Sequence, residues 1–527
     1  MDIGFLHDHR LPLSLILLEV VRLLFASDLI FQCFPCLEQR LFDYFVDEQH
    51  FLRRLVRAVD FSQIQALCRS RTPDHKGGIP PIAPLKLFKL YLVMFLFNIP
   101  GERELCRRAK ADLAIRWFCG FGLLRPIPVH STLSKFRSRM GIETFEAVFL
   151  DILRQCAEAK LIRAEEVILD ASKLLASATP IPPTRQRELL LKRFLEDLFH
   201  TPYVEPAAEQ DKLTLHAIIK RAAAMVGSPV RDVQKFWNRF VQHLQPPTNA
   251  APQPVRFPKL SPSKLTQSLR KALAAIPHAI GDPSARYGST GQEQPFLGYL
   301  STFTLDPHKQ VITATYLTHA AVFASEHFQP VYAQHKQNLA RIGLRGLLKR
   351  ALMDKGYDQA DVRQTLQNDA VQAFISPKER QNKHGVYSTD RFTLNDQGQL
   401  ICPNGLPMIP GPHRARNGGT VIYRCPLPQE CPLRSLCTKV KRRTVEIHPE
   451  AHRMRQASLA QKETPEFKAA MGRRRLIEAT FGHGKTAHHL DRALYRRVVM
   501  VRIQQLLAAT VQNMEKLVAA ASQVKST

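Results

Sequence analysis

Three acidic residues stand in contexts that could bring them together as ligands of catalytic metal ions. Asp170 ends an apolar strand pattern at residues 166–170, Asp354 ends another at 347–354, and Glu478 lies within a helical pattern. Neighbouring strand ends and a packed helix would unite the three carboxylates, although 184 residues separate the first pair (354−170) and 124 the second (478−354). Two Mg²⁺ or Mn²⁺ ions about 3.5–4 Å apart need such oxygen ligands, and they would activate a water or a 3′-hydroxyl and stabilise the leaving oxygen in phosphoryl transfer.

Each of these residues taken alone has a simpler interpretation, because a strand-end aspartate often caps a turn or a helix. The set, in this order of strands and helix, is what indicates metal-ion catalysis. The helical pattern also carries Arg474 four residues before Glu478 and Lys485 seven residues after it, and at about 3.6 residues per turn all three share one face. The two cations could hold the scissile and flanking phosphates of a phosphodiester substrate. The alternative is an ordinary salt-bridged helix face.

The overall charge points to a polyanionic partner. The chain of 527 residues has 74 lysines and arginines against 46 aspartates and glutamates, which gives a formal net charge of +28. This charge favours nucleic-acid binding, because phosphate neutralisation releases condensed counterions. A generally basic protein without specific DNA contacts would have the same composition.

Two features bear on the cellular compartment. Residues 11–34 are apolar, but Glu19, Arg22 and Asp28 interrupt them and are costly in a bilayer, so we expect a buried or amphipathic helix and no membrane partner. Ten cysteines are scattered along the chain without the dense framework of small secreted proteins, which indicates a reducing cytosol.

Four of the cysteines lie within 36 residues and could form a structural zinc site. They are Cys402, Cys425, Cys431 and Cys437. Their spacing is looser than that of paired CxxC motifs, and the alternative is free or buried thiols in a basic loop. The basic run at 439–443 (KVKRR) favours a DNA-facing surface in either case.

Hydrophobic periodicity predicts a helical N-terminal part followed by a mixed core. Helices are expected at 85–97 and 103–118, and Ser131 or Thr132 could cap a further helix with the basic residues Lys135, Arg137 and Arg139. Such short helices ending in a basic one are typical of a helix-turn-helix DNA reader, although a helical bundle with a solvated basic face fits as well. We expect Arg137 and Arg139 to project from this helix about 200° apart, so that one reaches a base edge and the other a phosphate.

The core pattern then alternates between strands and helices in the order β-β-β-α-β-α-β-α. Strands are expected at 166–170, 296–305, 311–317, 347–354 and 371–376, and helices at 325–341, 358–368, 472–488 and 499–517.

These motifs together resemble DDE transposases of bacterial insertion sequences. The matching segments are VILDASKL at 167–174, GDPSARYG at 281–288, GYLSTFTLD at 298–306, MDKGYDQADV at 353–362 and RRRLIEATFGHGKTAHHLDRALYRR at 473–497. The region from about residue 42 to 141, including HSTLSKFRSR, resembles the helical domain that precedes the core in these enzymes. The family's helical motif consists of a tyrosine, an arginine, a glutamate and a lysine at fixed spacing. Arg474, Glu478 and Lys485 fit that spacing, but Met471 occupies the tyrosine position. The phosphate or stacking contact of the tyrosine is therefore missing here.

The resemblance implies a ribonuclease-H-like α/β fold with a mixed five-stranded sheet, preceded by an all-α domain and interrupted by two insertions. The expected parts are an extension at 1–41, a helical DNA-binding domain at 42–160, a catalytic domain at 161–517 with a helical insert at 180–280 and a basic, cysteine-rich insert at 378–465, and a tail at 518–527.

The resemblance also implies a function, namely DNA cleavage and strand transfer at insertion-sequence ends. Asp170, Asp354 and Glu478 would bind two Mg²⁺ or Mn²⁺ ions, and Arg474, Lys485, Lys135, Arg137 and Arg139 would contact DNA. The implied partners are the terminal repeats, the target DNA and a second copy of the chain on paired ends, in the bacterial cytoplasm at the nucleoid. The alternatives are a nuclease on the same core, an inactive or decayed transposase that only binds DNA, and a structural RNA-binding protein, which accounts for the charge but not for the carboxylates.

Overall fold

The structure is a computed structural model, and only part of the chain is described from it. The described residues are 29–71, 82–182, 185, 220, 223, 231, 234–235, 279–288, 295–378, 385–414, 419–427 and 429–524. Most of the expected N-terminal extension, nearly all of the expected helical insert at 180–280 and the end of the expected tail therefore lie outside the described residues. Within the described part, no helix is both long and apolar enough to cross a membrane.

The N-terminal part is helical, as predicted. Its helices are α2 (Leu29–Phe45), α3 (Phe51–Ala58), α4 (Ser62–Ser70), α5 (Pro84–Leu96), α6 (Glu102–Ala111), α7 (Leu113–Cys119) and α8 (His130–Glu158). Helix α5 begins with Pro84, whose fixed φ suits a first helical position, and its residues from Leu87 to Leu96 are buried except Lys89. The single helix expected at 103–118 is divided, because the Asp112 side chain accepts a hydrogen bond from the Ile115 amide and caps a new helix there.

A six-stranded mixed sheet forms the centre of the described structure, and the mixed α/β class is confirmed. Its strands are β1 (Glu166–Leu175), β4 (Arg286–Gly288), β5 (Phe296–Asp306), β6 (Val311–His319), β7 (Arg350–Met353) and β8 (Gln372–Ile375). The order is β4-β5-β1-β7-β8, with β6 also paired to β5. β1, β7 and β8 are parallel, whereas β5 runs antiparallel to β1, β4 and β6. All five expected strands are present, and β4 is additional.

One strand end was predicted wrongly. β1 does not stop at Asp170 but continues to Leu175, because residues 171–175 remain paired with β5 as far as Leu175 opposite Gly298. The polar pair Ser172 and Lys173 obscured this continuation in the sequence. Asp170 therefore lies in the middle of a strand.

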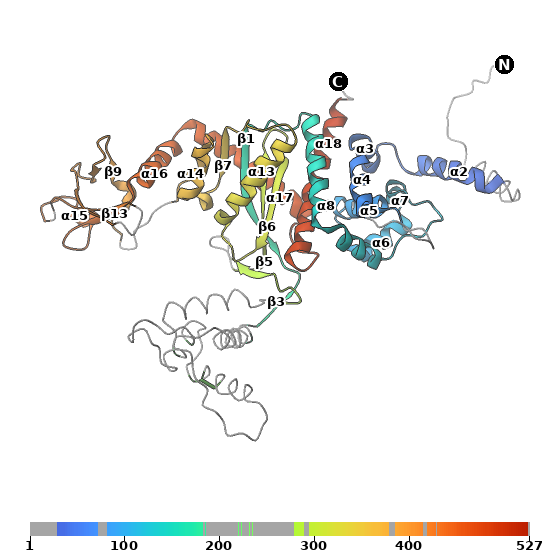
Figure 1. Ribbon diagram of the computed structural model, residues 1–527, viewed down its shortest axis with the longest axis horizontal. Coiled ribbons are helices and arrows are strands. Elements are labelled where there is room, and N and C mark those ends of the chain that lie inside the picture. The colour runs from blue at the N-terminus through green and yellow to red at the C-terminus, as the bar shows by residue number, and fades with distance from the viewer. Residues whose placement is uncertain are drawn as a thin grey trace, which may run out of the picture.

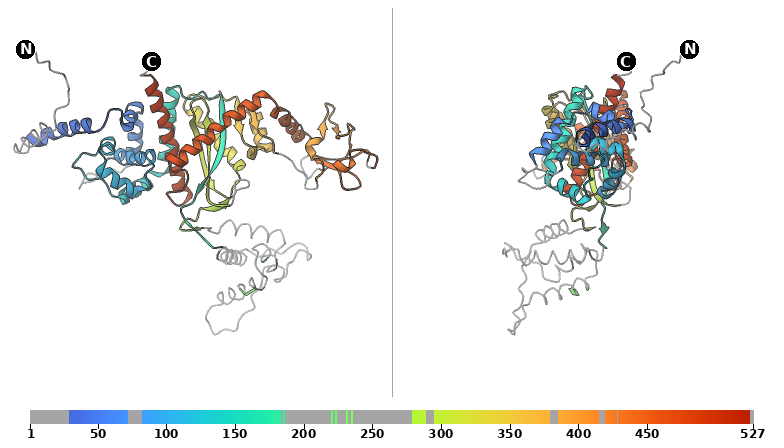
Figure 2. Two further views of the ribbon diagram at one scale, coloured as in Figure 1. Left: turned by 180° about the vertical axis from the view of Figure 1, so that it is seen from behind. Right: turned by 90° about the vertical axis from the view of Figure 1, so that its right-hand side faces the viewer.

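Helices cover both faces of the sheet. α13 (Phe328–Arg341) and α14 (Ala360–Asn368) pack on one face, and α17 (Pro465–Ala487) crosses the other, where it is the long orange-red helix in the left view of Figure 2. Because successive strand residues point to opposite faces, Val167 and Leu169 join the core under α13 and α14, and Ile168 joins the core under α17. Asp170, two residues after Ile168, consequently points to the α17 face.

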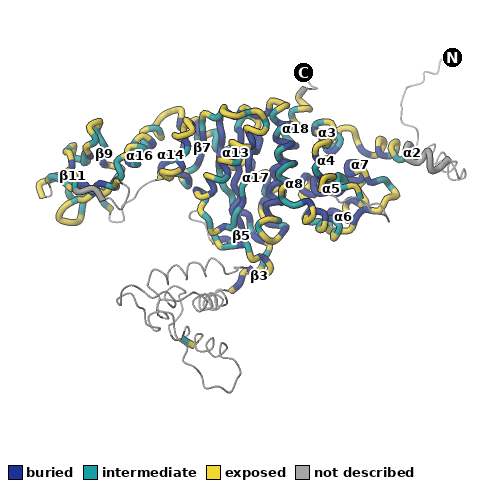
Figure 3. The backbone as a smooth tube through the Cα atoms, in the orientation of Figure 1, coloured by how far each residue is buried: buried dark blue, intermediate teal, exposed yellow. Residues whose placement is uncertain are grey.

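Helix α18 (Val498–Val524) joins the sheet to the N-terminal helices. It packs against α3, α5 and α8 on one side and β6 on the other, and Figure 1 shows it between these two parts. Its buried Asn513 side chain accepts a hydrogen bond from the Ile312 amide and donates one to the Ile312 carbonyl, at 2.9 and 2.8 Å. One continuous hydrophobic core thus runs through the two parts, visible as the dark blue stretch of α8, α18 and the strands in Figure 3.

The cysteine-rich segment forms a separate small β unit with its own core, at the left of Figure 1. It contains β9 (Thr393–Leu394), β10 (Leu400–Ile401), β11 (Ile409–Arg414), β12 (Thr420–Arg424), α15 (Arg434–Cys437) and β13 (Thr444–Ile447), and α16 (Pro449–Lys462) leads from it to α17. The remaining described elements are β2 (Thr179–Pro180), β3 (Ala279–Ile280) and the 3₁₀ helices η2 (Ala324–His327), η3 (Lys355–Tyr357) and η4 (Thr389–Arg391).

Replacing Gly298 with alanine should lower the free energy of unfolding by about 1–3 kcal/mol. An added Cβ would lie 2.2 Å from the Leu174 carbonyl oxygen, which belongs to the backbone of β1 and cannot rotate away. The paired strands β1 and β5 would have to separate locally. Urea denaturation followed by circular dichroism measures the loss.

Gly472→Ala is the matched control for this substitution. Gly472 lies inside α17 with nothing within 4 Å of an added Cβ. Alanine there should raise the free energy of unfolding by about 0.5–1 kcal/mol, because it restricts the unfolded chain. Equal effects of the two substitutions would contradict the close approach of β1 and β5.

Candidate functional site

Asp170 and Asp354 lie on adjacent parallel strands. Leu169 pairs with Met353, so Asp170 and Asp354 are the next residues on β1 and on the extension of β7. Asp354 caps η3, where its Oδ1 accepts a hydrogen bond from the Gly356 amide at 2.8 Å. Both aspartates thereby come to the α17 face of the sheet, on neighbouring strands rather than at opposite edges.

Glu478 reaches the same place from α17. The Arg474 guanidinium donates to Asp170 Oδ2 at 2.8 Å and, one helical turn on, to Glu478 Oε1. It therefore stands between the two carboxylates and links the helix to the central strand. The Glu478 side chain is 54% exposed, whereas that of Asp170 is only 17% exposed, so the group opens to solvent on the helix side.

The position of α17 is fixed by two further contacts with the strands. The Arg473 guanidinium forms a bidentate ion pair with the buried Glu166 at the start of β1, with both N–O distances at 2.7 Å. The Phe481 ring stacks on Phe303, the β5 partner of Asp170, at a centroid distance of 4.7 Å. These contacts lie on both sides of Glu478 along the helix and hold it over the strands.

Negative charge is concentrated at this group. Burial, and then the nearby Asp354 carboxylate, raise the pKa of Asp170 to about 6, against the opposing effects of the Ala171 amide and Arg474. The buried Tyr357 phenol also has a raised pKa, first because of burial and then because of Asp170 and Asp354. An additional cation at the carboxylates would relieve this repulsion, and hard divalent ions prefer such oxygen ligands. Tyr357 was not predicted from the sequence. The one indication of it was its position three residues after Asp354 in the segment MDKGYD.

Lys485 and Met471 lie on α17 as the motif spacing requires, seven residues on either side of Glu478. Lys485 is partly exposed. Met471, which replaces the tyrosine of the family motif, packs against the hydrophobic core, and its sulfur accepts a hydrogen bond from Ser376 at 3.5 Å. The methionine thus has a packing role at this position.

The expectation that Arg137 projects from the surface to contact DNA is wrong. Arg137 is 8% exposed, its guanidinium pairs with Glu102, and it lies over the Tyr495 ring at 3.7 Å from the centroid. Its place on α8 faces α6 and the segment that follows α17. Arg137 is consequently a packing residue that joins α8 to α6 and to the segment after α17.

Lys135 and Arg139 are exposed and lie four residues apart on the same side of α8. Next to Lys135 is an open pocket of about 740 Å³ lined by α6 and α8 residues, which continues into one of about 760 Å³ at residues 494–500. Arg103 lines both pockets and Arg496 lines the second, and both side chains are exposed. Sequence reasoning did not single out these two arginines, because the chain has many and only the fold brings them to Lys135.

The structure also brings the four cysteines to one cavity, although no three of their sulfurs all lie within 4.8 Å of one another. Cys402, Cys425, Cys431 and Cys437 all line one small cavity of about 10 Å³ in the β unit, and all four are unpaired and half-buried. Burial first, and then the proximity of the other three thiols, raise the pKa of Cys437, against the effect of Arg443. Separate loops contribute the thiols, as in a structural metal site.

Two family models match the chain. Residues 40–139 match the family described as Transposase domain (DUF772), and residues 401–518 match the family described as Transposase DDE domain. The first match covers most of the N-terminal helices, and the second includes the four cysteines and Arg474, Glu478 and Lys485, whereas Asp170 and Asp354 lie outside it. No curated protein and no solved structure matches. The two matches confirm the resemblance to DDE transposases.

Replacing Arg137 with methionine should lower the free energy of unfolding by about 3 kcal/mol. The poorly exposed Glu102 carboxylate would lose its positively charged partner and keep only the Tyr91 hydroxyl as a donor. Arg139→Met is the matched control, since it removes the same charge two residues away from an exposed position. Chemical denaturation should show almost no change for the control. A stable Arg137→Met protein would return this arginine to the set of DNA-contact candidates.

Proposed function

Because the chain carries the two domains of a DDE transposase, we propose that it catalyses DNA cleavage and strand transfer at the ends of an insertion sequence by two-metal-ion phosphoryl transfer. Transposition, with DNA as the substrate, is the function that the two domains indicate. The metal ligands, the strand-transfer step and the residues named below are the proposal.

The observation that carries the proposal is that three carboxylates gather around Arg474 on the α17 face of the sheet. Asp170 and Asp354 are neighbours through the pairing of Leu169 with Met353, and Arg474 links Asp170 to Glu478. The donor set suits Mg²⁺ or Mn²⁺, because it consists of oxygens and its charge is incompletely compensated. When bound, the ions would supply activation of a water or 3′-hydroxyl and stabilisation of the leaving oxygen.

The other residues of the group would bind and orient the DNA. Arg474 holds the Asp170 and Glu478 carboxylates in place, and together with Lys485 it would bind phosphates beside the scissile bond. Tyr357 is buried under the two aspartates and would exclude water from their inner side.

A ribonuclease-H-like core is part of the proposal. Its support is the order of the central strands, in which the antiparallel β5 and β6 lie on one side of β1 and the parallel β7 and β8 lie on the other. The expected bounds, 42–160 for the DNA-binding domain and 161–517 for the catalytic domain with inserts at 180–280 and 378–465, remain proposals, as do a homodimer on paired ends and a bacterial cytoplasmic location.

DNA would bind along the exposed basic residues of the N-terminal helices. Lys135 on α8 lines the first of the open pockets together with Arg103, Arg496 lines the second, and the exposed Arg139 lies one helical turn beyond Lys135. This surface would hold the terminal repeats through phosphate contacts that position the duplex. The four cysteines would bind a structural Zn²⁺ in the small β unit, whose core is otherwise only a few side chains.

Asp354→Asn should abolish DNA cleavage and leave DNA binding intact. The amide keeps the shape of the side chain and its bond to the Gly356 amide, but it loses the charge that would hold the ions. Cleavage and strand transfer are measured on DNA carrying the element's own ends in Mg²⁺, and binding is measured by gel shift.

Asp361→Asn is the matched control, an exposed aspartate seven residues later at the start of α14. It should cleave like the parent protein. Normal cleavage by Asp354→Asn would remove Asp354 from the proposal, and a parent protein that binds ends but never cleaves them in Mg²⁺ or Mn²⁺ would favour the inactive, DNA-binding alternative.

Replacing Lys135 and Arg139 together with alanine should weaken end binding and reduce the slope of log affinity against log salt by about two units, roughly one for each lost phosphate contact. Lys336→Ala is the control, because Lys336 lies on α13 at the opposite face of the sheet and is paired with Asp369 at 2.5 Å. Fluorescence anisotropy over a salt series gives the slopes. An unchanged slope for the double variant would make this surface a solvated basic face.

A further inference from the structure

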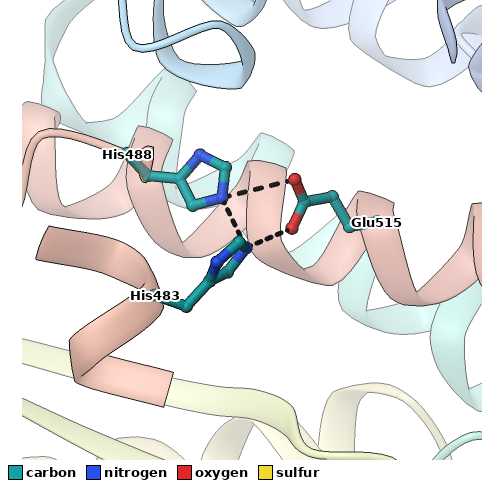
Figure 4. Close-up of side chains that lie close together, drawn as sticks. All are labelled: His483, His488 and Glu515. Carbon is teal, nitrogen blue, oxygen red and sulfur yellow. Dashed lines mark hydrogen bonds and ion pairs between the residues drawn. The ribbon is translucent and has the colours of Figure 1, made fainter. Parts of the chain in front are cut away.

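A group of side chains of types that commonly bind metal ions lies at the C-terminal end of α17. Figure 4 shows His483, His488 and Glu515 pointing toward one another, the histidines from the end of α17 and the residue after it, and the glutamate from α18. Within the described part of the chain, they are the one set of three His, Cys, Asp or Glu residues whose ligand atoms all lie within 4.8 Å of one another. No motif in the sequence pointed to them, because Glu515 is 27 residues beyond His488.

The spacing of the ligand atoms suits one small cation. The His483 and His488 Nε2 atoms are 3.0 Å apart, His483 Nε2 lies 2.8 Å from Glu515 Oε2, and His488 Nε2 lies 3.3 Å from Glu515 Oε1. Ligand atoms around tetrahedral zinc, at bond lengths of about 2.0–2.1 Å, are separated by about 3.3 Å. The three side chains would therefore need to open by only a few tenths of an ångström.

His488 is oriented as a metal ligand. Its side chain is fully buried, and its Nδ1 lies 2.8 Å from the Phe95 carbonyl oxygen at the end of α5. A carbonyl can only accept, so Nδ1 carries a proton, and in the neutral form of the ring Nε2 would present its lone pair toward His483 and Glu515. Metal-binding histidines usually donate their second ring N–H to such an oxygen.

The backbone around the group holds it together without a metal. An added Cβ at Gly484 would lie 2.5 Å from Leu490 and 3.0 Å from Gln512, so glycine permits α17 to approach the α18 turn that carries Glu515. The Asn98 side chain donates a hydrogen bond to the Thr486 carbonyl at 3.0 Å and joins the loop after α5 to the end of α17. Three elements from distant parts of the chain meet here.

This group is separate from the carboxylates at Asp170. His483 follows Glu478 by five residues, which places the two side chains about 140° apart around α17. Glu478 points to β1, where Arg474 links it to Asp170, whereas His483 points to α18. The donor sets differ as well, since two imidazoles and one carboxylate favour zinc over Mg²⁺.

We propose that His483, His488 and Glu515 bind one zinc ion, which ties α17 to α18 and, through His488, to α5 of the N-terminal helices. The His483 side chain is 51% exposed, so solvent can reach the site and supply a water as the fourth ligand. The ion replaces the proton that two imidazoles and a carboxylate would otherwise share. It stabilises the joint between the N-terminal helices and the helix that carries Glu478.

The test compares zinc binding by the full-length parent protein and by His483→Gln and Glu515→Gln, after removal of metals with a chelator. Equilibrium dialysis against Zn²⁺ in excess Mg²⁺ should show one zinc ion fewer per chain in each variant, with affinity at this site lowered more than about 100-fold, since losing even an outer partner costs about 10–100-fold. His308→Gln, in the turn between β5 and β6, is the matched control and should bind as much zinc as the parent.

Two further measurements separate this site from the cysteines and from a folding defect. Co²⁺ at the triad should give visible ligand-field absorption without sulfur charge-transfer bands, and Cys431→Ser should leave that absorption unchanged. Without metal, His483→Gln should melt at the same temperature as the parent, because the His483 side chain is half exposed. Added zinc should raise the melting temperature of the parent by more than it raises that of His483→Gln. Equal zinc content and equal zinc-dependent melting shifts in the parent and both variants would overturn the proposal.

Discussion

The packing of α17 on the sheet depends on compensating the negative charge that Asp170 and Asp354 place on that face. Two carboxylates on neighbouring strands repel one another, and Asp170 is poorly hydrated, which raises its pKa to about 6. Arg474 provides one positive charge between Asp170 and Glu478. The ion pair of Arg473 with Glu166 and the stacking of Phe481 on Phe303 then fix the same helix at either side of Glu478. An arrangement of this kind stores unfavourable charge where a divalent cation can neutralise it.

The high positive charge of the chain is divided between packing and surface. Arg137 and Arg473 form ion pairs with Glu102 and Glu166, so their charges are compensated within the fold, although Arg137 also lines the open pockets beside Lys135. Lys135 and Arg139, which belong to the same short basic stretch as Arg137, are exposed instead. A net charge of +28 therefore predicts a polyanionic partner, but it does not identify which cations meet that partner.

The chain offers three sets of ligand atoms that differ in chemical character. The oxygen set at Asp170 suits hard ions, the thiols around Cys402 suit zinc, and the imidazoles of His483 and His488 with Glu515 lie between them. Helix α17 connects the first and the third sets, and α16 leads from the β unit of the second set to α17. One hydrophobic core already connects the N-terminal helices to the sheet through α18. An ion at the end of α17 would therefore add rigidity to existing packing.

Local patterns in the sequence determined most of the secondary structure. The periodicity of residues 85–97 and 296–305 predicted α5 and β5 to within one residue, and that of residues 499–517 predicted α18 except for its last seven residues, because these segments bury one face or nearly all of their surface. Residue types and their order likewise singled out Asp170, Asp354 and Glu478 as candidates, since each carboxylate alone is common but the set in this order of strands and helix is not. The two ends of the chain resembled transposase domains for the same reason, and the family matches confirmed it.

Only the tertiary structure decided where side chains point and which distant residues meet. Arg137 and Arg139 are two residues apart and chemically identical, yet only the packing of α8 against Glu102 and Tyr495 makes the first a buried ion pair. The extension of β1 to Leu175 follows from its pairing with β5, which the polar residues 172–173 hid. His483 and His488, Glu515 and the Phe95 carbonyl come from three distant places in the chain, and no local pattern relates them. The hydrophobic periodicity of a segment predicts which of its own faces is buried. It does not predict which other segment covers that face, because that depends on the packing of the whole chain.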